Sequence, residues 1–108
     1  MVWGALWLHK ATGDSSYLQK AQKYYNDFDL AYINEVFSWD DKVAGAKILL
    51  AQATGSSQDL SAVRELCQTY VDYKRSPRGR THFMQWGSLR YSSNGAFICL
   101  QVLFPTYI

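Results

Sequence analysis

The amino-acid sequence predicts an all-α protein made of repeated antiparallel helical hairpins, and three observations support this prediction. Apolar residues recur at spacings of three and four through most of the chain, as in amphipathic helices. Glycine-containing turns separate the helical segments. One pattern of helix, turn and helix returns 42 residues later, which is typical of stacked helical pairs.

The first hairpin covers the N-terminal quarter of the chain. Its first helix is expected from Val2 to Ala11, with an apolar stripe formed by Trp3, Leu6 and Trp7. Thr12-Gly13-Asp14 ends this helix, because Gly13 suits a left-handed C-terminal position and Asp14 or Ser15 can cap the next helix. That second helix continues to about Asp29-Leu30 and has its apolar positions at Tyr17, Leu18, Ala21, Tyr24, Tyr25 and Phe28.

The second hairpin repeats the first at a fixed offset. A helix is expected from Ala44 to Ala53, a turn at Thr54-Gly55-Ser56-Ser57 and a second helix from Leu60 to Tyr73. Ala11-Thr12-Gly13 recurs as Ala53-Thr54-Gly55, 42 residues later. Each pair leaves an apolar stripe that only a neighbouring pair can bury, so stacking is expected.

The third unit begins after the Ser76-Pro77-Arg78-Gly79 turn. Trp86–Tyr91 leads into a helix at Asn94–Gln101, and no partner helix follows within this sequence. We therefore expect one domain over residues 1–101, which is a fragment of a larger domain, and a divergent apolar tail over residues 102–108.

The charge pattern and composition exclude several classes of protein. A formal net charge of +2, from 11 basic and 9 acidic residues, does not favour a nucleic-acid or anionic-membrane partner. The basic cluster Lys74–Arg80 is expected to be a solvated loop. No apolar run is long enough to cross a bilayer, and the start of the chain lacks the features of a signal peptide. Cys67 and Cys99 lie within periodic apolar segments, where we expect free thiols that pack as small hydrophobes.

Two similar segments, Phe37–Lys42 (FSWDDK) and Gln85–Tyr91 (QWGSLRY), precede the second and third units. Each places a Trp beside polar groups where a loop enters a helix. Sugar rings stack on indoles and need planar donors and acceptors for their hydroxyls, so the two segments suit one side of a sugar-binding groove. A Trp at a helix start can equally be a packing residue, and at least one of Asp40 and Asp41 is expected to cap the helix that follows.

These segments carry a resemblance to a known family. Residues 3–25, the segment FSWDDKVAGAKILLAQATG and the segment RSPRGRTHFMQWGSLRYSSNGAFICLQ resemble the middle-to-late part of glycoside hydrolase family 9, the endo-β-1,4-glucanases or cellulases. The resemblance covers about residues 2–101. It implies a partial (α/α)6 toroid with an open cleft for a β-1,4-glucan (cellulose) chain. It also implies that the cleft is bordered in this chain by Trp39, Asp40, Trp86, Arg90 and Tyr91.

The resemblance assigns a role to each of these five residues. Trp39 and Trp86 would stack glucosyl rings, Arg90 and Asp40 would bond hydroxyls, and Tyr91 would orient sugar or a neighbouring side chain. Family members are inverting enzymes that use a Glu as general acid and an Asp as general base. Both lie in family segments outside this chain, and the adjacent Asp40 and Asp41 cannot bracket one bond. We expect no catalytic residue, no metal and no cofactor here, with His9 and His82 in surface or packing roles.

The sequence therefore favours a partial endo-β-1,4-glucanase that supplies substrate-binding residues and is inactive alone. Its partners would be a β-1,4-glucan and the remainder of the catalytic domain, with no nucleic acid and no membrane. The family resemblance implies an extracellular location. The alternative is a non-catalytic glucan-binding module or helical-repeat interaction module. A general helical-repeat scaffold fits the hairpins but does not explain Trp86–Tyr91.

Overall fold

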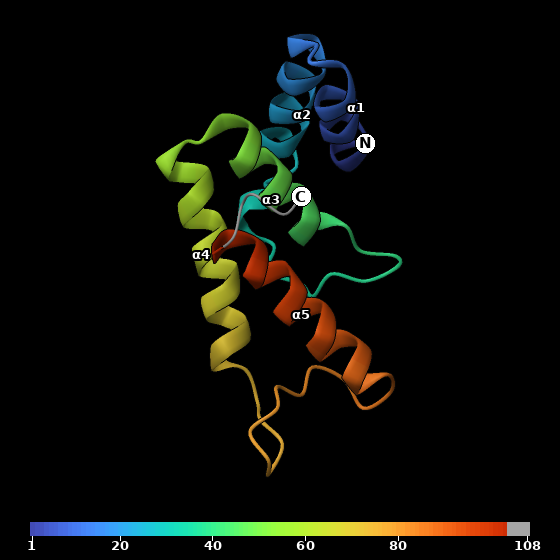
Figure 1. Ribbon diagram of the computed structural model, residues 1–108, viewed down its shortest axis with the longest axis vertical. Helices are drawn as coiled ribbons and strands as arrows, with labels where there is room; N and C mark the ends of the chain where they lie inside the picture. The colour runs from blue at the N-terminus through green and yellow to red at the C-terminus, as the bar shows by residue number, and fades with distance from the viewer. Residues whose placement is uncertain (104–108) are drawn as a thin grey trace.

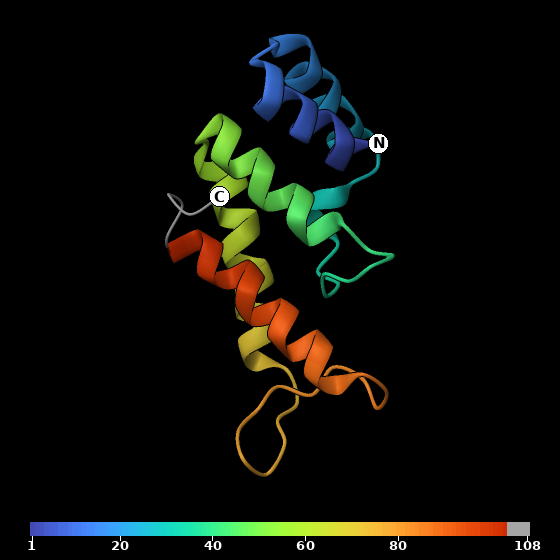
Figure 2. The same cartoon turned by 45° about the vertical axis from the view of Figure 1, so that its right-hand side comes forward.

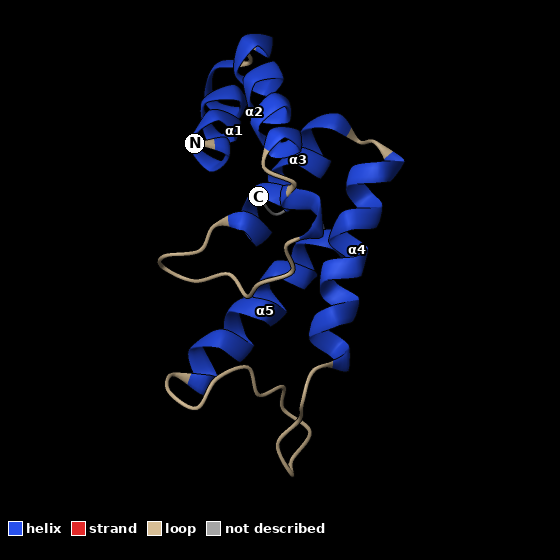
Figure 3. Ribbon diagram, turned by 180° about the vertical axis from the view of Figure 1, so that it is seen from behind, coloured by secondary structure: helices blue, strands red, loops and turns tan. Residues whose placement is uncertain are grey.

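The computed structural model describes residues 1–103, and within them the regular structure is entirely helical (Figures 1 and 3). The predicted all-α class is confirmed. The elements, in chain order, are α1 (Val2–Thr12), α2 (Ser15–Asp27), the 3-10 helix η1 (Leu30–Tyr32), α3 (Val43–Thr54), α4 (Ser57–Asp72) and α5 (Ser88–Leu103). Among these described residues, none of the helices has the length and apolar character needed to cross a bilayer.

The helices form stacked hairpins, and each complete hairpin has one helix in each of two layers. Helices α1, α3 and α5 lie in one row and run in roughly the same direction (Figure 2). Helix α2 returns antiparallel against α1, and α4 returns against α3 and also packs on α5. The two complete predicted hairpins are therefore α1–α2 and α3–α4. Because all three helices of the first row begin on the same side of the molecule, the loops that precede α3 and α5 are brought to that side (Figures 1 and 2).

The 42-residue repeat is visible in the hydrogen bonds of the two hairpin turns. Gly13 and Gly55 end α1 and α3 with φ of 73° and 63°, in the left-handed region that favours glycine. In the first turn Thr12 Oγ1 donates a 2.7 Å hydrogen bond to the carbonyl of Leu8. The equivalent Thr54 Oγ1 donates a 3.0 Å hydrogen bond to the carbonyl of Leu50. The same sequence therefore builds the same turn twice.

The start of α4 carries a reciprocal cap that can be tested. Ser56 Oγ accepts a 3.1 Å hydrogen bond from the Asp59 N–H and donates a 2.7 Å hydrogen bond to the Asp59 carboxylate. Since the cap satisfies an otherwise unpaired helix N–H, Ser56→Ala should lower the free energy of unfolding by about 1 kcal/mol. Urea denaturation followed by circular dichroism measures this loss. The neighbouring exposed Ser57→Ala is the control, and an equal loss in both variants would contradict the assignment.

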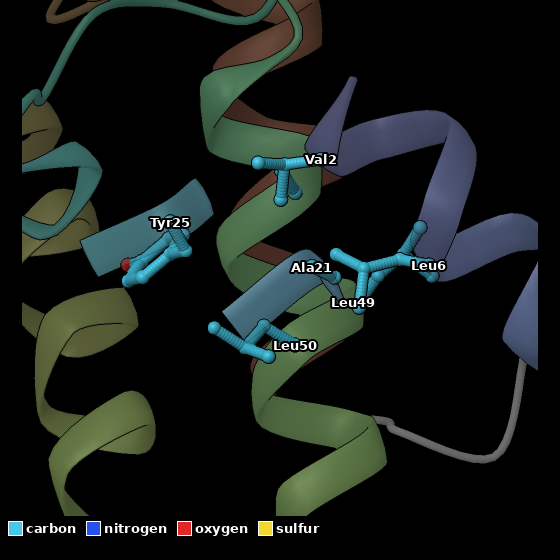
Figure 4. Close-up of a cluster of buried hydrophobic side chains, with 7 residues drawn as sticks. Val2, Leu6, Ala21, Tyr25, Leu49 and Leu50 are labelled. Carbon is cyan, nitrogen blue, oxygen red and sulfur yellow. The ribbon is translucent and has the colours of Figure 1, made fainter. Parts of the chain in front are cut away.

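Two buried clusters form the core, and α3 contributes to both. The first cluster joins α1, α2 and α3 and contains Val2, Leu6, Ala21, Tyr25, Ala46, Leu49 and Leu50 (Figure 4). The second joins α3, α4 and α5 and contains Ala44, Ile48, Ala51, Val63, Leu66, Tyr70 and Ile98. Every residue from 44 to 51 is buried, as expected for a helix with neighbours on all sides.

The structure corrects the expectation of free thiols. Cys67 of α4 and Cys99 of α5 form a disulfide, with their Cα atoms 5.6 Å apart. The prediction was wrong because each cysteine was judged within its own helix, whereas pairing depends on which helices become neighbours. The disulfide also shows that α5 is joined covalently to the preceding hairpin.

The predicted bounds of several helices shift, most of all those of α4 and α5. Helix α4 begins at Ser57, where Ser56 caps it, and not at Leu60. Helix α5 begins at Ser88 and extends through Leu103, so it passes the expected end at Gln101. Residues 104–108 of the predicted apolar tail lie outside the described residues.

Candidate functional site

The candidate site is formed by the loop before α3 (residues 33–42) and the loop before α5 (residues 83–87). Both loops project from the same side of the molecule (Figures 1 and 3). Trp39 in the first loop is 76% exposed and Trp86 in the second is 85% exposed. Within this chain neither indole is a packing residue. Their exposure leaves the faces of both rings open to a ligand.

The loop before α3 is anchored to all three helices beneath it. The buried Lys47 of α3 donates 2.9 Å and 2.7 Å hydrogen bonds to the carbonyl of Ala31 and to Asn34 Oδ1. The Tyr70 hydroxyl of α4 donates to the carbonyl of Glu35. From α5, Asn94 Nδ2 donates a 2.8 Å hydrogen bond to the carbonyl of Phe37. The loop that carries Trp39 is therefore held in place by side chains from each neighbouring helix.

The Phe37 ring adds an apolar contact to these anchors. It lies 5.8 Å from the Trp3 ring, centroid to centroid, and both rings pack over Gly45 of α3. A Cβ atom at Gly45 would approach Phe37 Cε2 to 2.8 Å. The glycine therefore gives the two rings the space they occupy.

In the loop before α3, the adjacent residues Asp40 and Asp41 have different hydrogen-bond partners. Asp41 Oδ1 accepts a 2.9 Å hydrogen bond from the N–H of Val43, the first residue of α3. This is the helix-start role expected for one of the pair. Asp40 instead accepts a hydrogen bond from the hydroxyl of the buried Ser38. Its carboxylate therefore remains exposed beside the cavity described next.

A cavity of about 280 Å³ lies between the two loops and the C-terminal part of α4. Asp40 and Tyr91 are the two predicted site residues that line it, and Trp39, Trp86 and Arg90 do not. The other lining residues are Asn34, Glu35, Val36, Ser38, Asp41, Thr69, Tyr70, Tyr73, Phe83 and Met84. The sequence did not identify the contribution of α4, because Tyr70 belongs to the ordinary apolar periodicity of that helix. No local signal marks it as a cavity residue.

The positive charge of Arg90 acts on the carboxyl group of Asp40. The Ser38 hydroxyl lowers the pKa of the Asp40 carboxyl, and the positive charge of Arg90 lowers this pKa further. The Arg90 guanidinium carbon lies 4.6 Å from the centroid of the Tyr91 ring. A carboxylate with a lowered pKa stays ionised near neutrality. Such a carboxylate can accept hydrogen bonds from hydroxyl groups, but it is a poor general acid because it holds no proton to donate.

The part of the chain that the structure describes contains no cluster of three or more His, Cys, Asp or Glu side chains that could hold a metal ion. What the site presents is two exposed indoles, an ionised carboxylate, a guanidinium and a phenol. By their chemistry, such groups are suited to contact planar apolar faces and hydroxyl groups of one ligand.

The described residues form stacked helical hairpins, and the loops before α3 and α5 carry the exposed Trp39 and Trp86. The sequence profile of glycosyl hydrolase family 9 matches residues 1–103, and the chain belongs to this family. The family resemblance predicted from the sequence motifs is thereby confirmed. The described hairpins correspond to part of the family toroid.

Individual relatives support the same assignment. Endoglucanase B of Cellulomonas fimi is 34% identical over 116 residues, covering 93% of this chain and 11% of that protein. Endoglucanase 13 of Arabidopsis thaliana is 28% identical and covers 91% of this chain and 22% of its own length. The structure of an endoglucanase from the termite Nasutitermes takasagoensis superposes with a TM-score of 0.89 at 34% identity, covering 94% of this chain and 24% of that one. The chain therefore spans about a tenth to a quarter of these relatives.

Proposed function

We propose that this chain forms part of the substrate cleft of an endo-β-1,4-glucanase and contributes binding residues without the catalytic acid and base. The observation that carries the proposal is the pair of highly exposed indoles, Trp39 and Trp86, on loops that project from one side of a family 9 fold. Two exposed indoles on neighbouring loops offer apolar faces on which sugar rings can stack. The names of the relatives give the glucan as the substrate class.

Each site residue has a role consistent with its surroundings. Trp39 and Trp86 stack glucosyl rings. Arg90 donates to sugar hydroxyls and Asp40 accepts from them, since its lowered pKa keeps it ionised. Tyr91 lines the cavity and lies against Arg90, so it orients either the sugar or the guanidinium.

We further propose that this chain alone does not hydrolyse the glucan. Asp41 is engaged at the start of α3, and the lowered pKa of Asp40 works against proton donation. The general acid and base are assigned to other segments of the catalytic domain, which act as partners of this one. We also propose that the catalytic-domain fragment covers residues 1–101 and that residues 102–108 are a divergent apolar tail. An extracellular location is also proposed, and the Cys67–Cys99 disulfide supports an oxidising compartment.

Affinity electrophoresis through gels containing hydroxyethyl cellulose, a neutral soluble β-glucan, tests the proposal. The wild-type chain should be retarded, and Trp86→Ala should bind about tenfold more weakly because one stacking platform is lost. Trp7→Ala, on α1 outside the two site loops, is the matched control and should keep its retardation. Equal mobility of wild type and Trp86→Ala at every polymer concentration would contradict the assigned cleft.

The same samples test the absence of catalysis. Incubated with the polymer, the chain should release no more reducing sugar than a heat-inactivated sample. Release above that background would show that the chain holds its own acid and base. Retardation without hydrolysis, unchanged when the remaining parts of a family 9 domain are supplied, would favour the non-catalytic binding module.

A further inference from the structure

The small net charge of the chain conceals a strong asymmetry along the sequence. All nine acidic residues lie at or before Asp72. Residues 73–108 contain five basic and no acidic side chains, whereas residues 1–72 carry a formal charge of −3. Four of those five basic residues lie between Lys74 and Arg80. The positive charge is therefore concentrated in one loop between α4 and α5.

This loop is a preorganised hairpin, which we call the basic hairpin (residues 74–82). The His82 N–H donates a 2.7 Å hydrogen bond to the carbonyl of Lys74, and Arg75 pairs with Thr81 across the hairpin. The Arg75 guanidinium donates 2.7 Å hydrogen bonds to the carbonyls of Val71 and Gly79. Arg75 thus holds the hairpin closed from within.

The remaining basic side chains of the hairpin are open to a ligand. Lys74, Arg78 and Arg80 are exposed. Over the described residues 1–103, the ion pair that forms is Lys23 with Asp27 on α2, so none of these three cations is neutralised by a carboxylate. Holding several unpaired cations together has an electrostatic cost that an anionic ligand would relieve.

The basic hairpin stands at the edge of the candidate site. Tyr73 before it and Phe83 and Met84 after it line the cavity that also contains Asp40 and Tyr91. The Tyr73 and Phe83 rings lie 4.9 Å apart, centroid to centroid, and close the base of the hairpin. In the ribbon the hairpin extends from the end of the molecule between α4 and α5 (Figure 1). A polymer that occupied the cavity could extend toward it.

We infer that the basic hairpin binds carboxylate groups carried by the glucan, so that the site favours an acidic, substituted β-glucan over a neutral one. Arg78 and Arg80 would engage carboxylates through paired N–H donors and Lys74 as a point charge. The inference rests on the proposed function, because it names the substrate class of the same site.

The charges of the cavity favour a polysaccharide over a continuous polyanion. Glu35, Asp40 and Asp41 line the cavity itself and would repel the closely spaced phosphates of a nucleic acid. A substituted glucan offers neutral rings to the cavity and separate negative groups to the hairpin. It therefore matches both parts of the surface.

Affinity electrophoresis on two polymers separates this inference from the proposed function. Carboxymethyl cellulose should retard the wild-type chain about fivefold more strongly than hydroxyethyl cellulose at low ionic strength, and the difference should vanish at about 1 M salt. The double variant Arg78→Glu/Arg80→Glu should lose this preference and keep its binding to hydroxyethyl cellulose. The double variant Lys10→Glu/Lys20→Glu, with the same change in net charge on exposed positions of α1 and α2, should keep the preference.

The outcomes are distinguishable. Equal loss of preference in both double variants would show attraction by net charge alone and would overturn the inference. Preference unaffected by Arg78→Glu/Arg80→Glu would also overturn it, and retardation by single-stranded DNA as strong as by carboxymethyl cellulose would reject the glucan as the ligand. Failure of the wild type to bind hydroxyethyl cellulose would instead count against the proposed function. Circular dichroism of each variant confirms that the helices are retained.

Discussion

Breaking the Cys67–Cys99 disulfide is expected to lower the free energy of unfolding by about 4 kcal/mol. The two cysteines are 32 residues apart in sequence, and the bond restricts the unfolded chain over that whole loop. The loss should be felt most by α5, whose helix–helix packing is mainly against α3 and α4. Urea denaturation of the wild type and of Cys67→Ser/Cys99→Ser, with and without a reductant, measures the difference.

Limited trypsin digestion is an independent control for this bond. The exposed basic hairpin offers a cleavage site after Arg78, which divides the chain into residues 1–78 and 79–108 with one cysteine in each. The two fragments should migrate together without a reductant and separate with it. Separation without a reductant, or two titratable thiols in the native protein, would contradict the disulfide. The reductant should not change the stability of the double serine variant.

The second large effect concerns the buried Lys47, whose charge should make stability depend on pH. Burial lowers the pKa of Lys47 from 10.5 to about 8, although the negative charge of Glu65 opposes the shift. Between these two values the unfolded chain binds more protons than the folded chain, so the free energy of unfolding rises with pH. The full rise would be about 3 kcal/mol and should begin near pH 8. Urea denaturation at intervals from pH 7 to 10 measures it.

Two variants isolate this effect from other titrations. Lys47→Met should abolish the rise between pH 8 and 10, whereas the exposed Lys20→Met should retain it. Above pH 10 the curve should turn downward in every variant, because burial raises the pKa of Tyr25 to about 12 and the unfolded chain loses that proton first. A parallel rise in wild type and Lys47→Met would contradict the role of Lys47.

The sequence predicted the helices and turns because these depend on neighbouring residues. The glycines at positions 13 and 55 and the apolar spacing around them were enough to place two hairpins and their offset. The loops that hold Trp39 and Trp86 could be recognised because each indole stands beside polar residues at a helix start. The helices, their turns and the two site loops could therefore be predicted from local patterns in the sequence.

The features that the sequence did not predict all depend on which helices become neighbours. Cys67 and Cys99 each fit the apolar pattern of their own helix, so nothing local indicated a bond between them. Tyr70 and Phe83 are 5.3 Å apart, centroid to centroid, yet one lies in a helix and the other in a loop. Lys47 stands where the periodicity calls for an apolar residue, and its partners are 16 and 13 residues away. Such contacts follow from the assembled fold.

The missing side chain of Gly45 links the packing of the buried helix α3 to the surface loop before it. The Trp3 ring from α1 and the Phe37 ring from the loop before α3 both pack over this glycine, and Phe37 is two residues before Trp39. A methyl group added at Gly45 would therefore displace an aromatic ring in the same loop that carries the exposed Trp39. The absence of a Cβ atom at Gly45 thus helps to set the conformation of the exposed loop before α3.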